Sequence, residues 1–156
     1  GVWIGLAAGV KLTPLAFGLV FLVRGQLRPI LAMGLTFAAT VLAGFLVLPR
    51  DAVVFWTEAV VSDERVGSTA YVDNTSLQGV LLHLGVPGEA EPLLRWALVL
   101  AMVVGVALLI RVLAVRGMIL SVVAVNALVM LYMSPVTWSH HHLWWGLVFT
   151  ALWVEA

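Results

Sequence analysis

The sequence has no cysteine and very little charge. Without cysteine, the chain can form neither a disulfide framework nor a zinc site built on thiolates. Eight basic and eight acidic residues among 156 give a formal net charge of zero, so the charge balance points to no nucleic-acid partner. The basic residues are seven arginines and the single Lys11, in a chain rich in alanine, glycine and valine. This bias is typical of a GC-rich, bacterial genome.

Apolar residues take the place of the missing charge. They make up 63% of the chain, and the mean hydropathy of +1.11 excludes an ordinary soluble domain. A helix needs roughly 20 apolar residues to cross a hydrocarbon core of about 30 Å. The apolar runs cover residues 2–23, 29–48, 93–115, 117–133 and 143–156. The last run is too short for a full crossing.

These runs predict an all-α, polytopic transmembrane helix bundle. We expect a single membrane domain over residues 1–156, with about four complete spans and a truncated fifth. The chain starts without methionine and stops inside the last apolar run. We therefore expect it to be a piece of a longer protein.

Arginines orient the predicted spans. The short loops between spans carry Arg24, Arg28, Arg111 and Arg116. Short basic loops stay on the cytoplasmic side of a membrane, so the long polar loop 49–92 and the segment 134–142 are predicted to be extracytoplasmic. The long loop is predicted to hold two short interfacial helices. One covers residues 51–61, and the other follows the capping-box pattern Thr75-Ser76-Leu77-Gln78.

Three of the four histidines stand together in the polar segment, at His140, His141 and His142. So many donors and acceptors at a membrane boundary need water or a ligand. Consecutive helical positions point about 100° apart, and no second cluster of ligating residues accompanies them, so no metal site is expected. Imidazoles here could donate to a phosphate or carry protons near neutral pH. The alternative is interfacial anchoring beside Trp138 in an aromatic belt.

Two cations are candidates for phosphate binding. Lys11 lies inside the first apolar run, where a buried ammonium needs an anionic partner, and Thr13 and the backbone loosened by Pro14 add further polar groups. The alternative is a lysine that snorkels to the headgroups. Arg65 in the outer loop offers a second phosphate contact, and its alternative is a solvated loop charge.

Two amides are candidates for sugar binding. Asn74 and Gln78 belong to one short polar stretch of the outer loop, and amide groups donate and accept in fixed directions, as sugar hydroxyls require. The start of a capped helix explains the same stretch without any ligand.

Three stretches, taken in their order and spacing, resemble one family. They are Gly9-Val10-Lys11-Leu12-Thr13-Pro14, then Arg65-Val66-Gly67 followed by Asn74-Thr75-Ser76-Leu77-Gln78-Gly79, and Ser134-Pro135-Val136-Thr137-Trp138-Ser139-His140-His141. Set among such spans, they resemble the C-terminal half of glycosyltransferase family 87, the actinobacterial, polyprenyl-phosphate-mannose-dependent mannosyltransferases of the membrane-embedded GT-C class. Thr75 stands where the family more often has glutamine, and His142 is an additional histidine.

The resemblance implies inverting transfer of mannose from a polyprenyl monophosphate to a hydroxyl of a glycolipid or lipoglycan acceptor. An alpha-(1,2) link would form outside the bacterial cytoplasmic membrane, with membrane lipids around the protein and no cofactor. The residues expected at the donor phosphate are Lys11, His140, His141 and Arg65. Those expected at the sugar are Asn74, Gln78 and Trp138, the last stacking on a sugar face or on the prenyl chain.

The family places its catalytic carboxylate on the first outer loop, which lies upstream of this chain. No catalytic residue is therefore assigned, and the chain alone is expected to be inactive. Two other function classes fit the same residues. A transporter or flippase for an amphiphilic anion could use the lysine and the histidines as a binding site. A membrane scaffold would use the polar loops only to cap helices, and would tolerate substitution of Lys11 and of the histidines.

Overall fold

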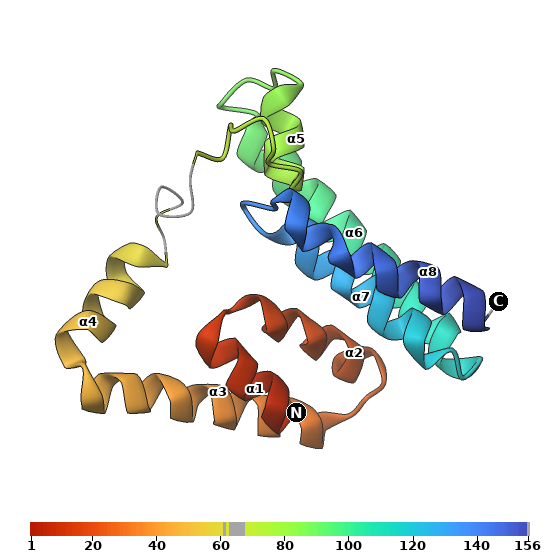
Figure 1. The fold of residues 1–156 in the computed structure, drawn as a ribbon, viewed down its shortest axis with the longest axis horizontal. Coiled ribbons are helices and arrows are strands. Elements are labelled where there is room, and N and C mark those ends of the chain that lie inside the picture. Colours follow the sequence, from red (N-terminus) through yellow and green to blue (C-terminus); the bar gives the residue numbers. More distant parts are fainter. Residues whose placement is uncertain (61, 63–67, 156) are drawn as a thin grey trace. The chain divides into compact units, whose positions relative to one another are not determined.

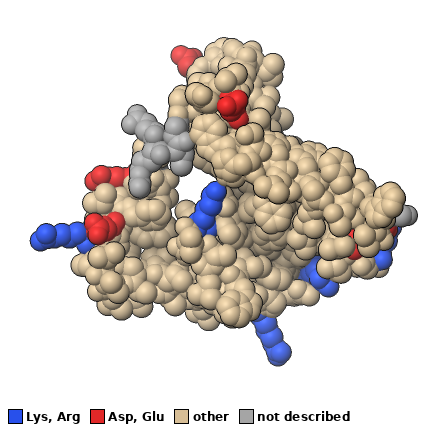
Figure 2. Space-filling view, viewed as in Figure 1, with Lys and Arg blue, Asp and Glu red and all other residues tan. Residues whose placement is uncertain are grey.

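The regular elements of the computed structural model are all helices within the residues it describes, which are 1–60, 62 and 68–155. The predicted all-α class is therefore confirmed. The chain divides into two compact units, Gly1–Gly67 and Ser68–Ala156, coloured red to yellow and green to blue in Figure 1. On the face drawn in Figure 2, charged side chains are few and scattered over an otherwise uncharged surface.

The first unit is built on close packing of α1 (Val2–Val10) against α3 (Leu27–Val47), which lie along each other in Figure 1. The face of α1 toward α3 carries Gly1, Gly5 and Gly9. A Cβ on Gly5 would lie 2.5 Å from the carbonyl oxygen of Met33 and 2.8 Å from Cβ of Thr36. Glycines at four-residue spacing thus let the two backbones approach closely, as small residues do between membrane helices.

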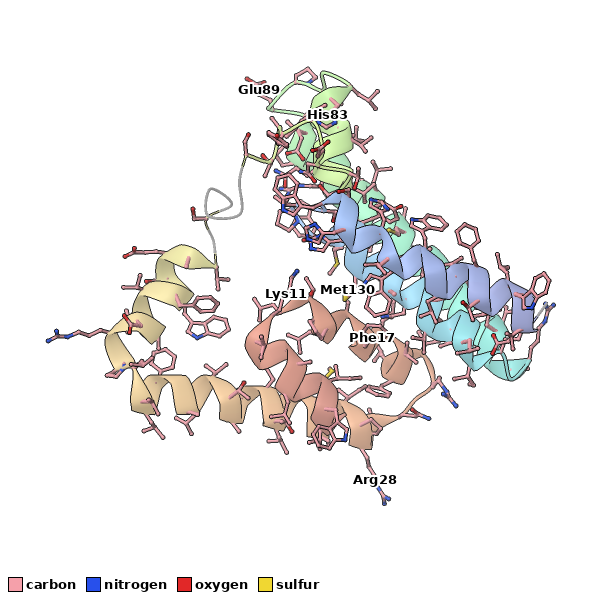
Figure 3. All side chains as sticks on the ribbon, viewed as in Figure 1. Lys11, Phe17, Arg28, His83, Glu89 and Met130 are labelled. Carbon is pink, nitrogen blue, oxygen red and sulfur yellow. The ribbon has the colours of Figure 1, made fainter. Side chains whose placement is uncertain are left out.

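The apolar run 2–23 differs from the prediction of one continuous span, because the helix is divided at Lys11. Lys11 has an extended backbone, with φ −150° and ψ 127°. The 3-10 helix η1 (Thr13–Phe17) and the α-helix α2 (Gly18–Val23) follow it. Pro14 has no N–H to donate to the carbonyl four residues earlier, and it disfavours helical backbone at the preceding residue. Lys11 is consequently exposed at a turn, as Figure 3 shows.

The helix predicted over 51–61 starts slightly earlier and changes its winding. It begins as α4 (Pro49–Val54) and continues as the π-helix η2 (Phe55–Ala59); position 61 lies outside the described residues. Within it, Trp56 meets the ring of Phe37 edge to face, with centroids 6.1 Å apart. This contact holds η2 against the middle of α3.

In the second unit, α6 (Glu91–Val115), α7 (Ile119–Met133) and α8 (Trp144–Glu155) pack together and run side by side in Figure 1. The turn from α6 to α7 passes through Gly117, whose φ of +75° suits a residue without Cβ. At the other end of α8, the carboxylate of Glu155 accepts the N–H groups of Leu120 (2.9 Å) and Ser121 (2.8 Å). The end of α8 therefore caps the start of α7.

By length and composition, two helices of the described chain could cross a membrane: α3, with 21 residues, and α6, with 25. Helices α6, α7 and α8 begin and end within two residues of the predicted runs 93–115, 117–133 and 143–156. The predicted number of spans and their orientation stay predictions.

Candidate functional site

The side chain of Asn74 joins two polar stretches that are about 60 positions apart in the sequence. It is fully buried and makes four hydrogen bonds. Its Nδ2 donates to the carbonyls of Thr69 (2.7 Å) and Pro135 (3.0 Å), and its Oδ1 accepts the N–H groups of Ser76 (3.1 Å) and Thr137 (3.0 Å). An amide has two donor hydrogens and two acceptor lone pairs on its oxygen, so its capacity is filled.

The helix that follows Asn74 is α5 (Leu77–His83), and Ser76 is its N-cap. The Ser76 hydroxyl accepts the N–H of Gly79 at 3.1 Å and donates to the Pro135 carbonyl at 2.9 Å. The predicted capping-box pattern placed Thr75 at the cap, one residue too early. Gly79 has no room for a side chain, since a Cβ there would collide with the backbone of Asn74. The hydrogen bonds of Asn74 and Ser76 and the close contact at Gly79 thus explain these three residues without a ligand.

Thr75 is not the cap because its hydroxyl is used elsewhere. Both its backbone N–H (2.9 Å) and its Oγ1 (3.0 Å) donate to the carbonyl of Thr137. The same Oγ1 lies 2.7 Å from Nε2 of His142. A hydroxyl has one proton, which here goes to the carbonyl, so the imidazole N–H must be the donor in the second bond. His142 therefore carries a proton on Nε2.

The second fixed histidine is His141, in the 3-10 helix η4 (Ser139–Leu143). The ring Nδ1 of His141 accepts the backbone N–H of Trp138 at 3.1 Å, and the backbone N–H of His141 donates to the Trp138 carbonyl at 2.9 Å. An accepting Nδ1 carries no proton, so the neutral ring has its proton on Nε2. The ring of His140 lies against that of His141, with centroids 4.3 Å apart.

Trp138 directly precedes the 3-10 helix η4 that carries the three histidines. It is half-buried, and its ring meets that of Tyr71 edge to face, with centroids 5.6 Å apart. The stacking predicted for Trp138 on a sugar face or prenyl chain stays a prediction. Within the described residues, no three His, Cys, Asp or Glu side chains stand together as a metal site would require.

Sequence reasoning missed a cation, Arg95 in the first turns of α6. Its Nη1 donates to Oε1 of Gln78 at 3.0 Å, and its Nε lies 3.2 Å from Oε1 of Glu91. The last pair is at ion-pair distance without hydrogen-bond alignment. The signal was present as the four-residue spacing of Glu91 and Arg95, which places the two side chains on one helix face.

The residues predicted to bind the donor phosphate are distributed over both units. His140 and His141 lie in the second unit, and Lys11 lies in the first. The residue before Lys11, Val10, lines a cavity of about 300 Å³ formed by α1, α3, α4 and η2. Arg65 lies outside the described residues. Of the sugar-binding candidates, Gln78 is half-buried, whereas Asn74 has no exposed surface. Their sugar contacts stay predictions.

Comparison with known proteins gives one family match. The model described as glycosyltransferase family 87 matches residues 1–135. This match includes Lys11 and Asn74 and ends before His140. No solved structure gives a significant match.

Curated relatives with similar sequences come from mycobacteria. Two are named polyprenol-phosphate-mannose-dependent alpha-(1-2)-phosphatidylinositol mannoside mannosyltransferase. The protein of Mycolicibacterium smegmatis is 35% identical over 153 residues and that of Mycobacterium tuberculosis 36% over 148, each covering 92% of this chain and 34% of the relative. A phosphatidylinositol pentamannoside mannosyltransferase of M. smegmatis is 31% identical over 150 residues. The chain spans about a third of the length of these relatives.

Proposed function

The chain belongs to glycosyltransferase family 87, and from this we propose that its protein is a membrane hexosyltransferase that uses a polyprenyl-phosphate donor. The sugar is mannose, and the acceptor is a lipid-linked glycan on the extracytoplasmic face of a bacterial cytoplasmic membrane. The observation that carries the proposal is the family match together with relatives named for alpha-(1-2)-mannosyl transfer from such a donor.

The chemistry of the proposed reaction needs positive groups at the leaving phosphate. The bond between the anomeric carbon and the phosphate oxygen breaks, and the acceptor hydroxyl oxygen forms the new bond and loses its proton to a base. Negative charge grows on the phosphate, so cations and N–H donors placed around it stabilise the transition state. We assign this role to Lys11, His140 and His141, with Arg65 as a further cation. The base is assigned to a carboxylate upstream of this chain.

The fixed tautomer of His141 supports its part in this assignment. With Nδ1 accepting the Trp138 N–H, the ring proton lies on Nε2, which is a hydrogen-bond donor of the kind that a phosphate oxygen accepts. The Nε2–H of His142 is bonded to the hydroxyl oxygen of Thr75. We therefore give His142 and Asn74 a positioning role, in which they hold the segment that carries His141.

Removal of single phosphate-binding groups tests this function. The full-length enzyme with Lys11→Ala or His141→Ala would be assayed for transfer of labelled mannose from polyprenyl-phosphate-mannose into membrane glycolipid. A lost bond to a charged group lowers the rate about tenfold to a hundredfold. Arg28→Ala is the matched control, since Arg28 is an exposed cation at the start of α3 (Figure 3). Unchanged transfer in both variants would contradict the assignment, and movement of the donor across the membrane without transfer would indicate a flippase.

A further inference from the structure

We propose that the amide nitrogen of Gln78 is a hydrogen-bond donor to an oxygen of the polyprenyl-phosphate-sugar substrate, and that Arg95 is the positioning residue that makes it so. This rests on the proposed function. The proposal adds Arg95, which the sequence motifs did not contain, and it states that the nitrogen end of the Gln78 amide faces the substrate.

The argument starts from the bond between the two side chains. A guanidinium has five N–H donors and no acceptor. The group of Gln78 that lies 3.0 Å from Nη1 of Arg95 must therefore be the carbonyl oxygen. With Oε1 held in this way, Nε2 and its two hydrogens point away from Arg95. The amide cannot turn over without placing its own N–H₂ against the guanidinium.

Arg95 is itself held. Its side chain is 23% exposed and pairs with Glu91, whose side chain is only 8% exposed and lies one helical turn earlier in α6. The guanidinium carbon also lies 5.4 Å from the centre of the Trp96 ring, a distance that allows cation–π attraction. The carboxylate and the ring limit where the guanidinium can move, so it acts as a fixed donor and not as a mobile surface charge.

Gln78 is placed to use the free end of its amide. It is the second residue of α5, only half-buried, and it follows directly on the stretch 74–76 that Asn74 and Ser76 fix against residues 135 and 137. These bonds attach the start of α5 to the segment 134–142, which carries the histidines that we propose for the donor phosphate. A purely structural Gln78, which only ties α5 to α6, would need its oxygen but not its nitrogen.

Two substitutions separate these roles. Gln78→Glu keeps an oxygen for Arg95 and replaces the N–H₂ by an acceptor, whereas Gln78→Met removes both functions at similar volume. We expect both variants of the full-length enzyme to lose roughly tenfold or more in kcat/KM for polyprenyl-phosphate-mannose, with thermal unfolding in detergent unchanged for Gln78→Glu. Arg95→Lys keeps the positive charge but loses the planar guanidinium with its several N–H donors. It should therefore raise KM for the donor, with a smaller effect on kcat.

The source of the accepting oxygen is distinguished by inhibition with polyprenyl phosphate that carries no sugar. The uncharged variant Gln78→Met is used here, because the carboxylate of Gln78→Glu would itself repel a phosphate. If Gln78→Met weakens this inhibitor as much as it weakens the substrate, the acceptor is a phosphate oxygen; if the inhibitor binds as before, it is a sugar oxygen. Normal transfer by Gln78→Glu, with or without a defect in Gln78→Met, would overturn the inference while leaving the proposed function intact. Absence of transfer by the unmodified enzyme would overturn both.

Discussion

Nε2 of His142 lies 2.7 Å from Oγ1 of Thr75. The two residues are 67 positions apart in the sequence. The Thr75 hydroxyl donates its hydrogen bond to the Thr137 carbonyl, so its oxygen can accept a hydrogen bond from the imidazole. The loop before α5 and the 3-10 helix η4 are thus joined by a side-chain hydrogen bond.

The pair predicts energetic coupling. Thr75→Val removes the hydroxyl at similar volume, and His142→Phe removes the N–H donor while keeping a ring. Each change alone leaves a polar partner without its bond, and the double variant should cost less than the sum of the two single ones. We expect a coupling of about 1 kcal/mol in the free energy of unfolding. It would be measured by a double-mutant cycle in detergent, and additive effects would contradict the bond.

Asn74 is predicted to be the most sensitive residue of the stretch that precedes α5. Asn74→Ala would remove the partner of the Thr69 carbonyl and of the Ser76 and Thr137 N–H groups, while the Pro135 carbonyl would keep only the Ser76 hydroxyl. Asn74→Asp would place an acceptor against the carbonyls of Thr69 and Pro135. Each should lower the free energy of unfolding by about 2–4 kcal/mol. Asp73→Asn, at the exposed neighbouring position, is the control and should change it by less than about 0.5 kcal/mol. Equal effects at the two positions would contradict the role of Asn74.

The sequence was sufficient for features that depend on local periodicity. Long apolar runs located α3 and α6 closely, because twenty or so consecutive apolar residues leave few alternatives to a helix in a membrane. The end of α1 at Lys11 also has a local signal in the sequence, which is Pro14. Hydropathy alone does not show this break, because residues on both sides of the proline are apolar.

Features that depend on distant partners were not predictable. The local sequence around Asn74 predicts a ligand-binding amide or part of a helix start. In the structure its partners include Pro135 and Thr137, which no local pattern connects to it. The same holds for the glycines of α1. Their four-residue spacing is visible, but the closeness of α3 that makes it necessary is a tertiary contact.

The glycine contact between α1 and α3 predicts a strong contrast between two alanine substitutions. Gly5→Ala would drive a methyl group into the backbone of Met33 and the side chain of Thr36, and overpacking of this kind costs about 1–3 kcal/mol. Gly34→Ala, on α3 itself, meets nothing within 4 Å and should be neutral or stabilising by up to about 1 kcal/mol, because alanine is the better helix former. Thermal unfolding of both variants in detergent would show it, and equal unfolding temperatures would exclude the close packing.

The two nitrogens of His141 can be tested separately, because amide side chains imitate them one at a time. Asparagine places an oxygen near the position of Nδ1 and can accept the Trp138 N–H, but it has nothing at Nε2. Glutamine reaches the position of Nε2 with an N–H₂ donor and gives up the bond to Trp138. If Nε2–H binds the leaving phosphate, His141→Asn should fold normally and lose about tenfold to a hundredfold in mannose transfer. His141→Gln should then keep more activity than His141→Asn, at the cost of a less stable η4. The reverse order of activities would mean that His141 serves only to shape the backbone at Trp138, and would remove it from the residues assigned to the phosphate.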